Sequence, residues 1–180
     1  LDGLDPNLTL FRDDVDFGWR ARAAGHSVMV ATGAVAFHAQ ASATERRVVE
    51  VDGAFLHRPL LLDRRNAAYV LLANSSWWIL PWLVLQILGS AIARAIGFLI
   101  AKLPGYAADE ILAVGALIIR PDTLITARKI RRKQRFVSAR VIAEFIPPRW
   151  SQIRLASEGL FDAIRSKLFP ENVQVSTTSV

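Results

Sequence analysis

The sequence predicts a short α/β globular segment followed by an α-helical, membrane-associated region. Three observations support this fold class. The first 50 residues contain a helix pattern followed by two short β-like runs. Residues 67–93 form a run of 27 residues without a charge, in a chain of 180 residues of which 52% are hydrophobic. Residues 120–150 hold nine basic and two acidic residues, so this single block accounts for the net charge of +6.

Composition excludes several classes of function. The chain has no cysteine, which rules out disulfides, cysteine zinc sites and thiol catalysis. The basic block contains almost no aromatic side chain that could stack on a base, and we therefore expect no nucleic-acid partner. The chain opens at Leu1 without a signal-peptide pattern, and we expect a longer protein to continue upstream of it.

Residues 1–50 are predicted to be globular. Asp13 and Asp14 favour a helix start, and Gly25 suits the left-handed position after a helix end near residue 24. Two β-like runs follow at 28–31 and 34–37. The order helix, strand, strand is typical of the edge of a layered α/β domain.

Residues 51–66 are predicted to be a charged linker, and residues 67–119 to be transmembrane or interfacial helices. A membrane span needs about 20 apolar residues, so the run at 67–93 is long enough to cross. A core helix of a soluble protein is the alternative, but such helices seldom exceed about 25 residues without charges or caps. A break at Pro104-Gly105 leaves two arrangements open, namely a hairpin of two spans or one span with an interfacial helix.

Residues 120–150 are interpreted as a basic juxtamembrane segment whose solvated face lies near anionic headgroups. An amphipathic stripe and a polar tail follow in residues 151–180, which we expect to form a helix and a disordered end. The two segments therefore add membrane-surface contacts and no recognisable catalytic motif.

The acidic cluster near the start is the most informative feature for chemistry. Asp13, Asp14 and Asp16 place three carboxylates within four positions, where they repel one another unless a cation or a helix N-terminus relieves the charge. One alternative is purely structural, with Asp13 capping the helix and Asp16 three residues later. His38 ends the second β-like run, and a lone histidine there is usually structural.

Three phrases together resemble the C-terminal half of the catalytic domain of a family 2 glycosyltransferase. They are LDGLDP at 1–6, FRDDVDFGWRARAAGH at 11–26 and VAFH at 35–38. The resemblance covers about a quarter of the chain and implies a partial GT-A fold. The hydrophobic continuation is similar to membrane-attached actinobacterial enzymes of cell-envelope glycan assembly.

The resemblance also implies roles for individual residues. Asp14 would be the general base that deprotonates the acceptor hydroxyl, and Asp13 would shape the acceptor pocket. Asp16 and Trp19 would hold the helix or line the acceptor site. His38 would ligate a divalent metal, Mg²⁺ or Mn²⁺, that bridges the donor diphosphate.

The implied reaction is inverting transfer of a hexose from a nucleotide-sugar donor to a lipid-linked or cell-envelope glycan acceptor. The active site would face the cytoplasm at the cell membrane. The donor-binding strands would lie upstream of Leu1, so residues 1–180 alone should be inactive. The phrase IPPRW at 146–150 has Ile where processive synthases of this family have Gln, which disfavours processive synthesis. The alternative is a non-catalytic membrane-anchoring or interaction module whose basic segment binds lipid or a partner.

Overall fold

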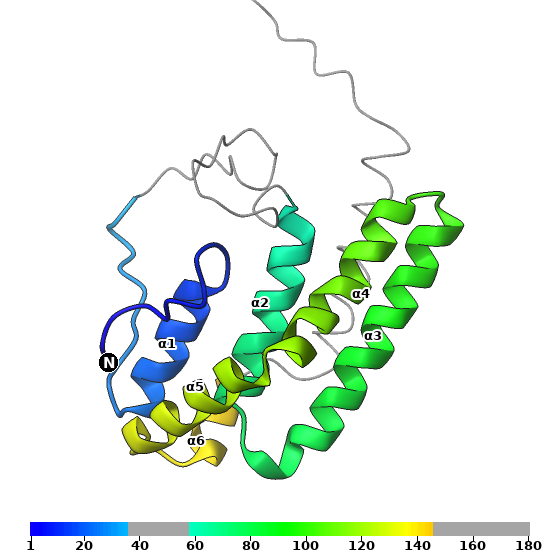
Figure 1. The fold of residues 1–180 in the computed structure, drawn as a ribbon. Helices are drawn as coiled ribbons and strands as arrows, with labels where there is room; N and C mark the ends of the chain where they lie inside the picture. Colours follow the sequence, from blue (N-terminus) through cyan, green and yellow to red (C-terminus); the bar gives the residue numbers. More distant parts are fainter. Residues whose placement is uncertain (36–57, 146–180) are drawn as a thin grey trace, which may run out of the picture. The chain divides into compact units, whose positions relative to one another are not determined.

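The computed structural model describes residues 1–35 and 58–145, all within one compact unit that ends at Phe145. Every regular element in these two ranges is a helix (Figure 1). The helices are α1 (Asp13–Ala23), α2 (Pro59–Asn74), the short 3-10 helix η1 (Trp77–Ile79), α3 (Leu80–Ile100), α4 (Pro104–Ile119), α5 (Pro121–Gln134) and α6 (Ala139–Ala143).

The prediction of an α/β fold with a partial GT-A domain is wrong for the described part of the chain. The β-like run at 28–31 is irregular, and the portion of the second run that the structure describes, residues 34 and 35, is irregular as well. Met29 and Val30 are almost fully exposed. A strand needs a neighbour to pair its backbone groups, and no described segment lies alongside this one as a strand. The described fold is therefore all-helical.

Proline sets the start of each long helix after α1. Pro59, Pro81, Pro104 and Pro121 all occupy the first or second position of their helices. Proline is favoured there because the missing N–H would have no partner in the first turn and its φ is already helical. It also disfavours a helical residue immediately before it, and the chain turns before Pro59, Pro104 and Pro121. Leu80, before Pro81, is helical, so the chain does not turn there.

Helix α1 ends as the sequence predicts. Gly25 has φ +90°, which places it in the left-handed region. Its N–H donates to the carbonyl of Arg22 at 3.0 Å, and the N–H of His26 donates to that of Ala21 at 3.0 Å. These two hydrogen bonds form a Schellman motif, which satisfies the last carbonyls of the helix.

The uncharged run at 67–93 is divided between two helices. Helix α2 begins at Pro59, inside the segment expected to be a linker, and ends at Asn74. Ser75 and Ser76 are extended, and the apolar helix of η1 and α3 starts at Trp77. The first third of the run therefore belongs to a helix that packs against α1, α4 and α5.

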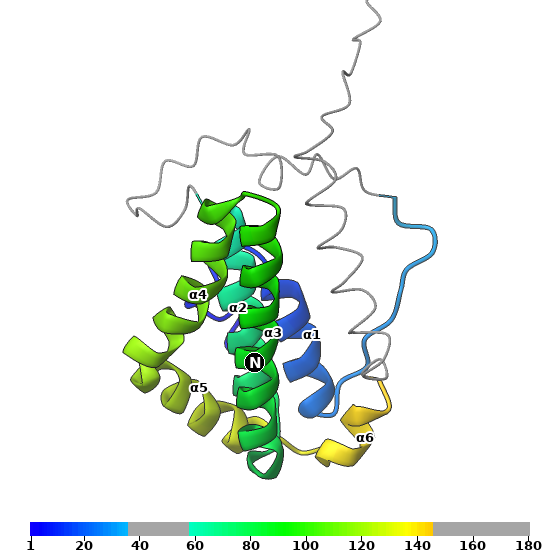
Figure 2. The ribbon, with the colours of Figure 1, turned by 90° about the vertical axis from the view of Figure 1, so that its right-hand side faces the viewer.

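Helices α3 and α4 lie side by side, joined by a turn at residues 101–103 (Figures 1 and 2). Buried Glu110 on α4 ties this pair to α2. Its carboxylate pairs with Arg64 of α2 at 2.9 Å and with Arg94 of α3 at 2.9 Å. Because both oxygens of the buried carboxylate face a guanidinium, the cost of burying its charge is offset.

One helix in the described ranges, Trp77–Ile100, is long and apolar enough to cross a membrane. Only 22% of its most apolar stretch is buried. Leu85, Ile92 and Leu99 are among its large side chains that are more than half exposed. A core helix of a soluble protein would bury such side chains, so this exposure is compatible with membrane association.

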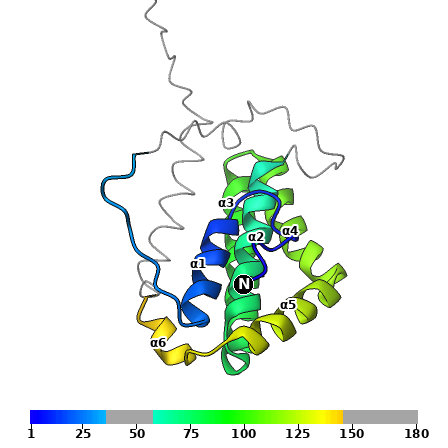
Figure 3. The same cartoon turned by 90° about the vertical axis from the view of Figure 1, so that its left-hand side faces the viewer.

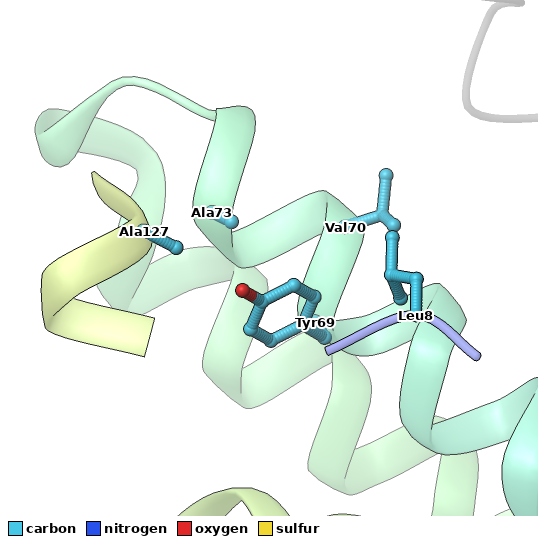
Figure 4. Packing of buried hydrophobic residues seen from close by; sticks show 5 residues of the cluster. All are labelled: Leu8, Tyr69, Val70, Ala73 and Ala127. Atoms are coloured by element: carbon cyan, nitrogen blue, oxygen red, sulfur yellow. The ribbon is translucent and has the colours of Figure 1, made fainter. Parts of the chain in front are cut away.

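The small hydrophobic core joins the N-terminal segment to α2 and α5. It consists of Leu8, Tyr69, Val70, Ala73 and Ala127 (Figure 4). Trp19 of α1 packs against this cluster as a partly buried side chain. Figure 3 gives the view from the α1 side, where the N-terminal segment crosses close to α2. The core thus fixes α1 and its acidic cluster on α2.

Candidate functional site

The three carboxylates at the start of α1 have different environments. Asp14 is exposed, Asp13 is partly exposed and Asp16 is fully buried. All three are in the first turn of the helix, where its positive dipole end favours negative charge. The helix is not capped by Asp13, because Arg12 takes the N-cap position and makes no side-chain capping bond. The structural alternative of a capping box is therefore not what forms.

The backbone before the cluster is strained. Phe11 and Arg12 have φ of +61° and +66°, a region that side chains other than glycine adopt at a cost. The guanidinium of Arg12 donates from Nε to Asp63 Oδ1 at 2.7 Å and from Nη2 to Oδ2 at 3.2 Å. The Asn66 amide donates to the carbonyls of Leu10 and Phe11. Two side chains of α2 therefore fix the turn that leads into Asp13 and Asp14.

The pairing with Asp63 also shifts the pKa of Arg12. The hydrogen bond to Asp63 raises the pKa of Arg12 above its ordinary value, although burial opposes the shift. The charges of Asp63 and Asp14 add to this effect. Arg12 is therefore a permanent cation next to the acidic cluster, where it partly relieves the repulsion between the carboxylates.

Asp14 is placed to meet a molecule from solution. Its Oδ1 accepts a hydrogen bond from the N–H of Val15 at 2.8 Å. Oδ2 has no hydrogen-bond partner within residues 1–35 and 58–145. An exposed, oriented carboxylate oxygen is what a general base needs in order to reach a hydroxyl proton.

Asp16 points into the protein and is the centre of a buried network. Its Oδ2 accepts from Arg20 Nε at 2.7 Å, and its Oδ1 accepts from Asn74 Nδ2 at 2.8 Å and from Arg131 Nη2 at 2.7 Å. Arg20 extends this network by donating to the carbonyls of Leu1 and Gly3. Asp16 thus holds α1, α2, α5 and the N-terminal segment together. Its side chain is directed into this network and away from any sugar acceptor at the surface.

A second carboxylate shares the same arginine. Arg131 Nη2 also donates to Asp5 Oδ2 at 2.7 Å, and the Tyr69 hydroxyl donates to that oxygen at 2.9 Å. Burial raises the pKa of Asp5, but hydrogen bonds from Asn7 and Tyr69 and the charge of Arg131 lower it more, so the pKa lies below its ordinary value. Burial also raises the pKa of Tyr69, which stays a neutral donor.

Trp19 packs on the core cluster, as described above, and its expected roles stay predictions. His38 lies outside the described residues, and its metal-binding role stays a prediction. The structure thus brings Asp13 and Asp14 together at the surface, and Asp16 and Trp19 inside.

The described residues do not form a metal site by themselves. Within residues 1–35 and 58–145, no three His, Cys, Asp or Glu side chains are grouped to hold an ion. Asp14 and Asp16 cannot chelate one ion together, because both oxygens of Asp16 are taken by arginine and asparagine donors. A divalent metal would depend on residues such as His38, and we assign no chemical step to it.

Four residues that matter here were not identified from the sequence, namely Asp63, Asn66, Asn74 and Arg131. A signal was available for two of them. Asn66 and Asn74 are eight positions apart in a largely apolar stretch, which places both on one face of a helix. Buried amides are almost always hydrogen-bonded, so this face had to meet polar groups. Comparison with protein-family models, curated proteins and solved structures gives no match for this chain.

Proposed function

We propose that this chain is part of a membrane-attached inverting glycosyltransferase. It would move a hexose from a nucleotide sugar to a lipid-linked or cell-envelope glycan. The observation that supports this best is the separation of the three carboxylates, with Asp13 and Asp14 at the surface and Asp16 in a buried network. If the cluster served only to hold the helix, Asp16 alone would suffice for the contacts between helices.

In this proposal Asp14 is the catalytic base. A hydroxyl oxygen of the acceptor attacks the anomeric carbon of the donor while Asp14 accepts the hydroxyl proton. The new glycosidic C–O bond forms on the face opposite the leaving nucleoside diphosphate, whose bond to the sugar breaks, so the configuration inverts. A positioned base of this kind contributes about 10²–10⁴-fold to a rate.

The fixed turn before α1 supports the same role. Catalysis by proton transfer requires the base to be held within a fraction of an ångström of its productive position. The contacts of Asp63 and Asn66 to residues 10–12 hold the start of α1 against α2. Asp13, next to the base and partly exposed, would contact the acceptor sugar.

The exposed apolar helix Trp77–Ile100 supports the membrane placement in this proposal. We propose that this helix crosses the cell membrane and that α4, which packs along it, returns the chain, so that α1 and α5 both lie on the cytoplasmic side. The basic residues of α5 favour that side by the positive-inside rule. Nucleotide sugars are made in the cytoplasm, so the acidic cluster would have access to a donor there.

The test is sugar transfer by the whole protein in membranes of its host, because the resemblance implies donor-binding residues upstream of Leu1. Membranes are incubated with radiolabelled UDP- and GDP-hexoses, and label in the lipid and glycan fractions is counted. We expect Asp14→Asn to lower transfer at least about 10²-fold. Asp13→Asn is the matched control at the neighbouring position, and we expect it to act mainly on the acceptor KM.

Equal protein levels in the membranes show that loss of transfer is not loss of fold. Full transfer by Asp14→Asn would reject the catalytic assignment. The non-catalytic anchoring module would then be the better explanation of the chain.

A further inference from the structure

A basic pocket lies where α2 ends, the apolar helix begins and α5 passes. It has a volume of about 660 Å³, within the size range of small-molecule sites. Its walls include the extended Ser75 and Ser76 and the ring pair Trp77 and Trp78. Five cations of α5 and the residue that follows it complete the lining: Arg128, Lys129, Arg131, Arg132 and Arg135. Among residues 1–35 and 58–145, no acidic side chain lines this pocket.

Only one of these five cations has a carboxylate partner in the described part of the chain. Arg131 is neutralised by Asp5 and Asp16. The guanidinium groups of Arg128 and Arg135 instead donate to the carbonyls of Leu72 and Asn74, at the C-terminal end of α2. These carbonyls carry only a partial negative charge, so most of the positive charge stays uncompensated.

Two further observations favour binding of an anion in this pocket. Burial, followed by the charges of Arg135 and Arg131, lowers the pKa of Arg128 below its ordinary value. The Nε of Arg135 is buried and has no hydrogen-bond partner in residues 1–35 and 58–145. An anion in the pocket would relieve the repulsion and accept this hydrogen bond.

The tryptophans beside the pocket are typical of a membrane surface. Trp77 and Trp78 stack with their ring centroids 3.9 Å apart, and both are more than 60% exposed. They are the first residues of the apolar helix Trp77–Ile100. Tryptophan is enriched at the level of lipid headgroups, and a basic pocket at that level faces their phosphates.

We propose that this pocket binds the phosphate of an anionic lipid headgroup at the surface of the bilayer. Lys129, Arg132 and Arg135 would donate charge-assisted hydrogen bonds to the phosphate oxygens, while Trp77 and Trp78 contact the glycerol and upper acyl region. The assignment rests on the membrane placement in the proposed function and is independent of the role of Asp14. A free phosphate is the other source of the same chemistry.

The experiment uses the full chain in nanodiscs of phosphatidylcholine with a minor fraction of phosphatidylglycerol. One lipid at a time is brominated, and quenching of tryptophan fluorescence reports which lipid lies next to the rings. For the unmodified chain we expect brominated phosphatidylglycerol to quench the tryptophan fluorescence well beyond what its mole fraction predicts. Brominated phosphatidylcholine should not quench beyond its mole fraction.

The pocket variant is Lys129→Gln with Arg132→Gln. Both side chains are exposed, so the fold should be kept, which far-UV circular dichroism checks. The matched control is Lys133→Gln with Arg140→Gln, which removes the same charge from exposed positions outside the pocket lining. At about 1 kcal/mol per cation near the surface, the pocket pair should lower the lipid preference about tenfold or more, and the control pair far less.

Three results would overturn the proposal. If both variants lose the preference for phosphatidylglycerol equally, the preference would reflect general attraction to a charged surface. Quenching in proportion to mole fraction, in a chain that incorporates into nanodiscs, would mean no lipid site while leaving the span intact. If millimolar inorganic phosphate protects the tryptophan fluorescence from quenching and the chain shows no lipid preference, the pocket would be assigned to a free phosphate. Failure of the chain to incorporate into nanodiscs would instead reject the membrane placement. None of these outcomes depends on transfer activity.

Discussion

Arg131 of α5 donates a hydrogen bond to Asp16 of α1 at 2.7 Å across 115 positions of sequence, and both side chains are buried. The same nitrogen reaches Asp5 at 2.7 Å. Three segments that are far apart in the chain therefore meet at one guanidinium. Such a pair stabilises the fold only while it is complete, because either charge left alone in the interior is strongly unfavourable.

Asp16→Asn should destabilise the protein by about 3 kcal/mol, since Arg20 would lose its buried counter-charge and Arg131 would keep only Asp5. Chemical unfolding of the detergent-solubilised chain, followed by circular dichroism, measures this. Asp14→Asn is the matched control and should change the free energy of unfolding by less than about 0.5 kcal/mol, because Asp14 is exposed. Similar losses in the two variants would contradict the buried network.

The sequence contains enough local information to predict α1 and its end, because capping depends on neighbours such as Gly25. It does not reveal that Asp16 turns inward, since the partner that stabilises it lies in α5. For the same reason Arg131 was assigned to a solvated basic face. The β-like pattern at 28–31 was misleading because strand formation depends on a pairing partner, which a local pattern does not show. The exposed apolar helix was predicted from length and composition alone, but its start at Trp77 depends on the break at Ser75 and Ser76.

Acid should destabilise the protein partly through Asp5. Its pKa is lower in the folded chain than the ordinary value of about 3.9. A depressed pKa contributes stability that is present above the unfolded value and is lost as pH falls through the folded value. We therefore expect the free energy of unfolding to decrease as the pH is lowered below about 4.

The check is to compare unfolding free energies between pH 2 and pH 6 for the unmodified chain and Asp5→Asn. The variant should be less stable at pH 6 and should show a shallower decline below pH 4. Tyr69→Phe, which removes one hydrogen bond to Asp5, should lie between the two. Parallel curves for all three proteins would mean that Asp5 does not contribute to the acid dependence.

Asp63→Asn should affect the proposed reaction more than it affects stability. The pair with Arg12 is partly exposed and is worth at most about 1 kcal/mol of unfolding free energy. If the pair positions Asp14, its loss should lower kcat by about tenfold or more, while the donor KM changes little. The double variant Arg12→Asp with Asp63→Arg restores the pair with reversed charges and should recover part of kcat. A loss of kcat that the reversed pair does not recover would argue against positioning.

Leu88→Arg should prevent stable insertion of the apolar helix into membranes. Leu88 is near the middle of Trp77–Ile100 and is partly exposed. An arginine at the centre of a span costs about 2.5–3.5 kcal/mol on insertion scales, which is enough to shift this helix toward the uninserted state. Membranes from cells that express each variant are washed with alkaline carbonate, and the pellet is assayed for the chain. The unmodified chain and Leu88→Ala should stay in the pellet, while much of Leu88→Arg should appear in the wash. Retention of Leu88→Arg equal to that of Leu88→Ala would show that Leu88 does not contact the hydrocarbon interior, and the span at Trp77–Ile100 would then have to be rejected.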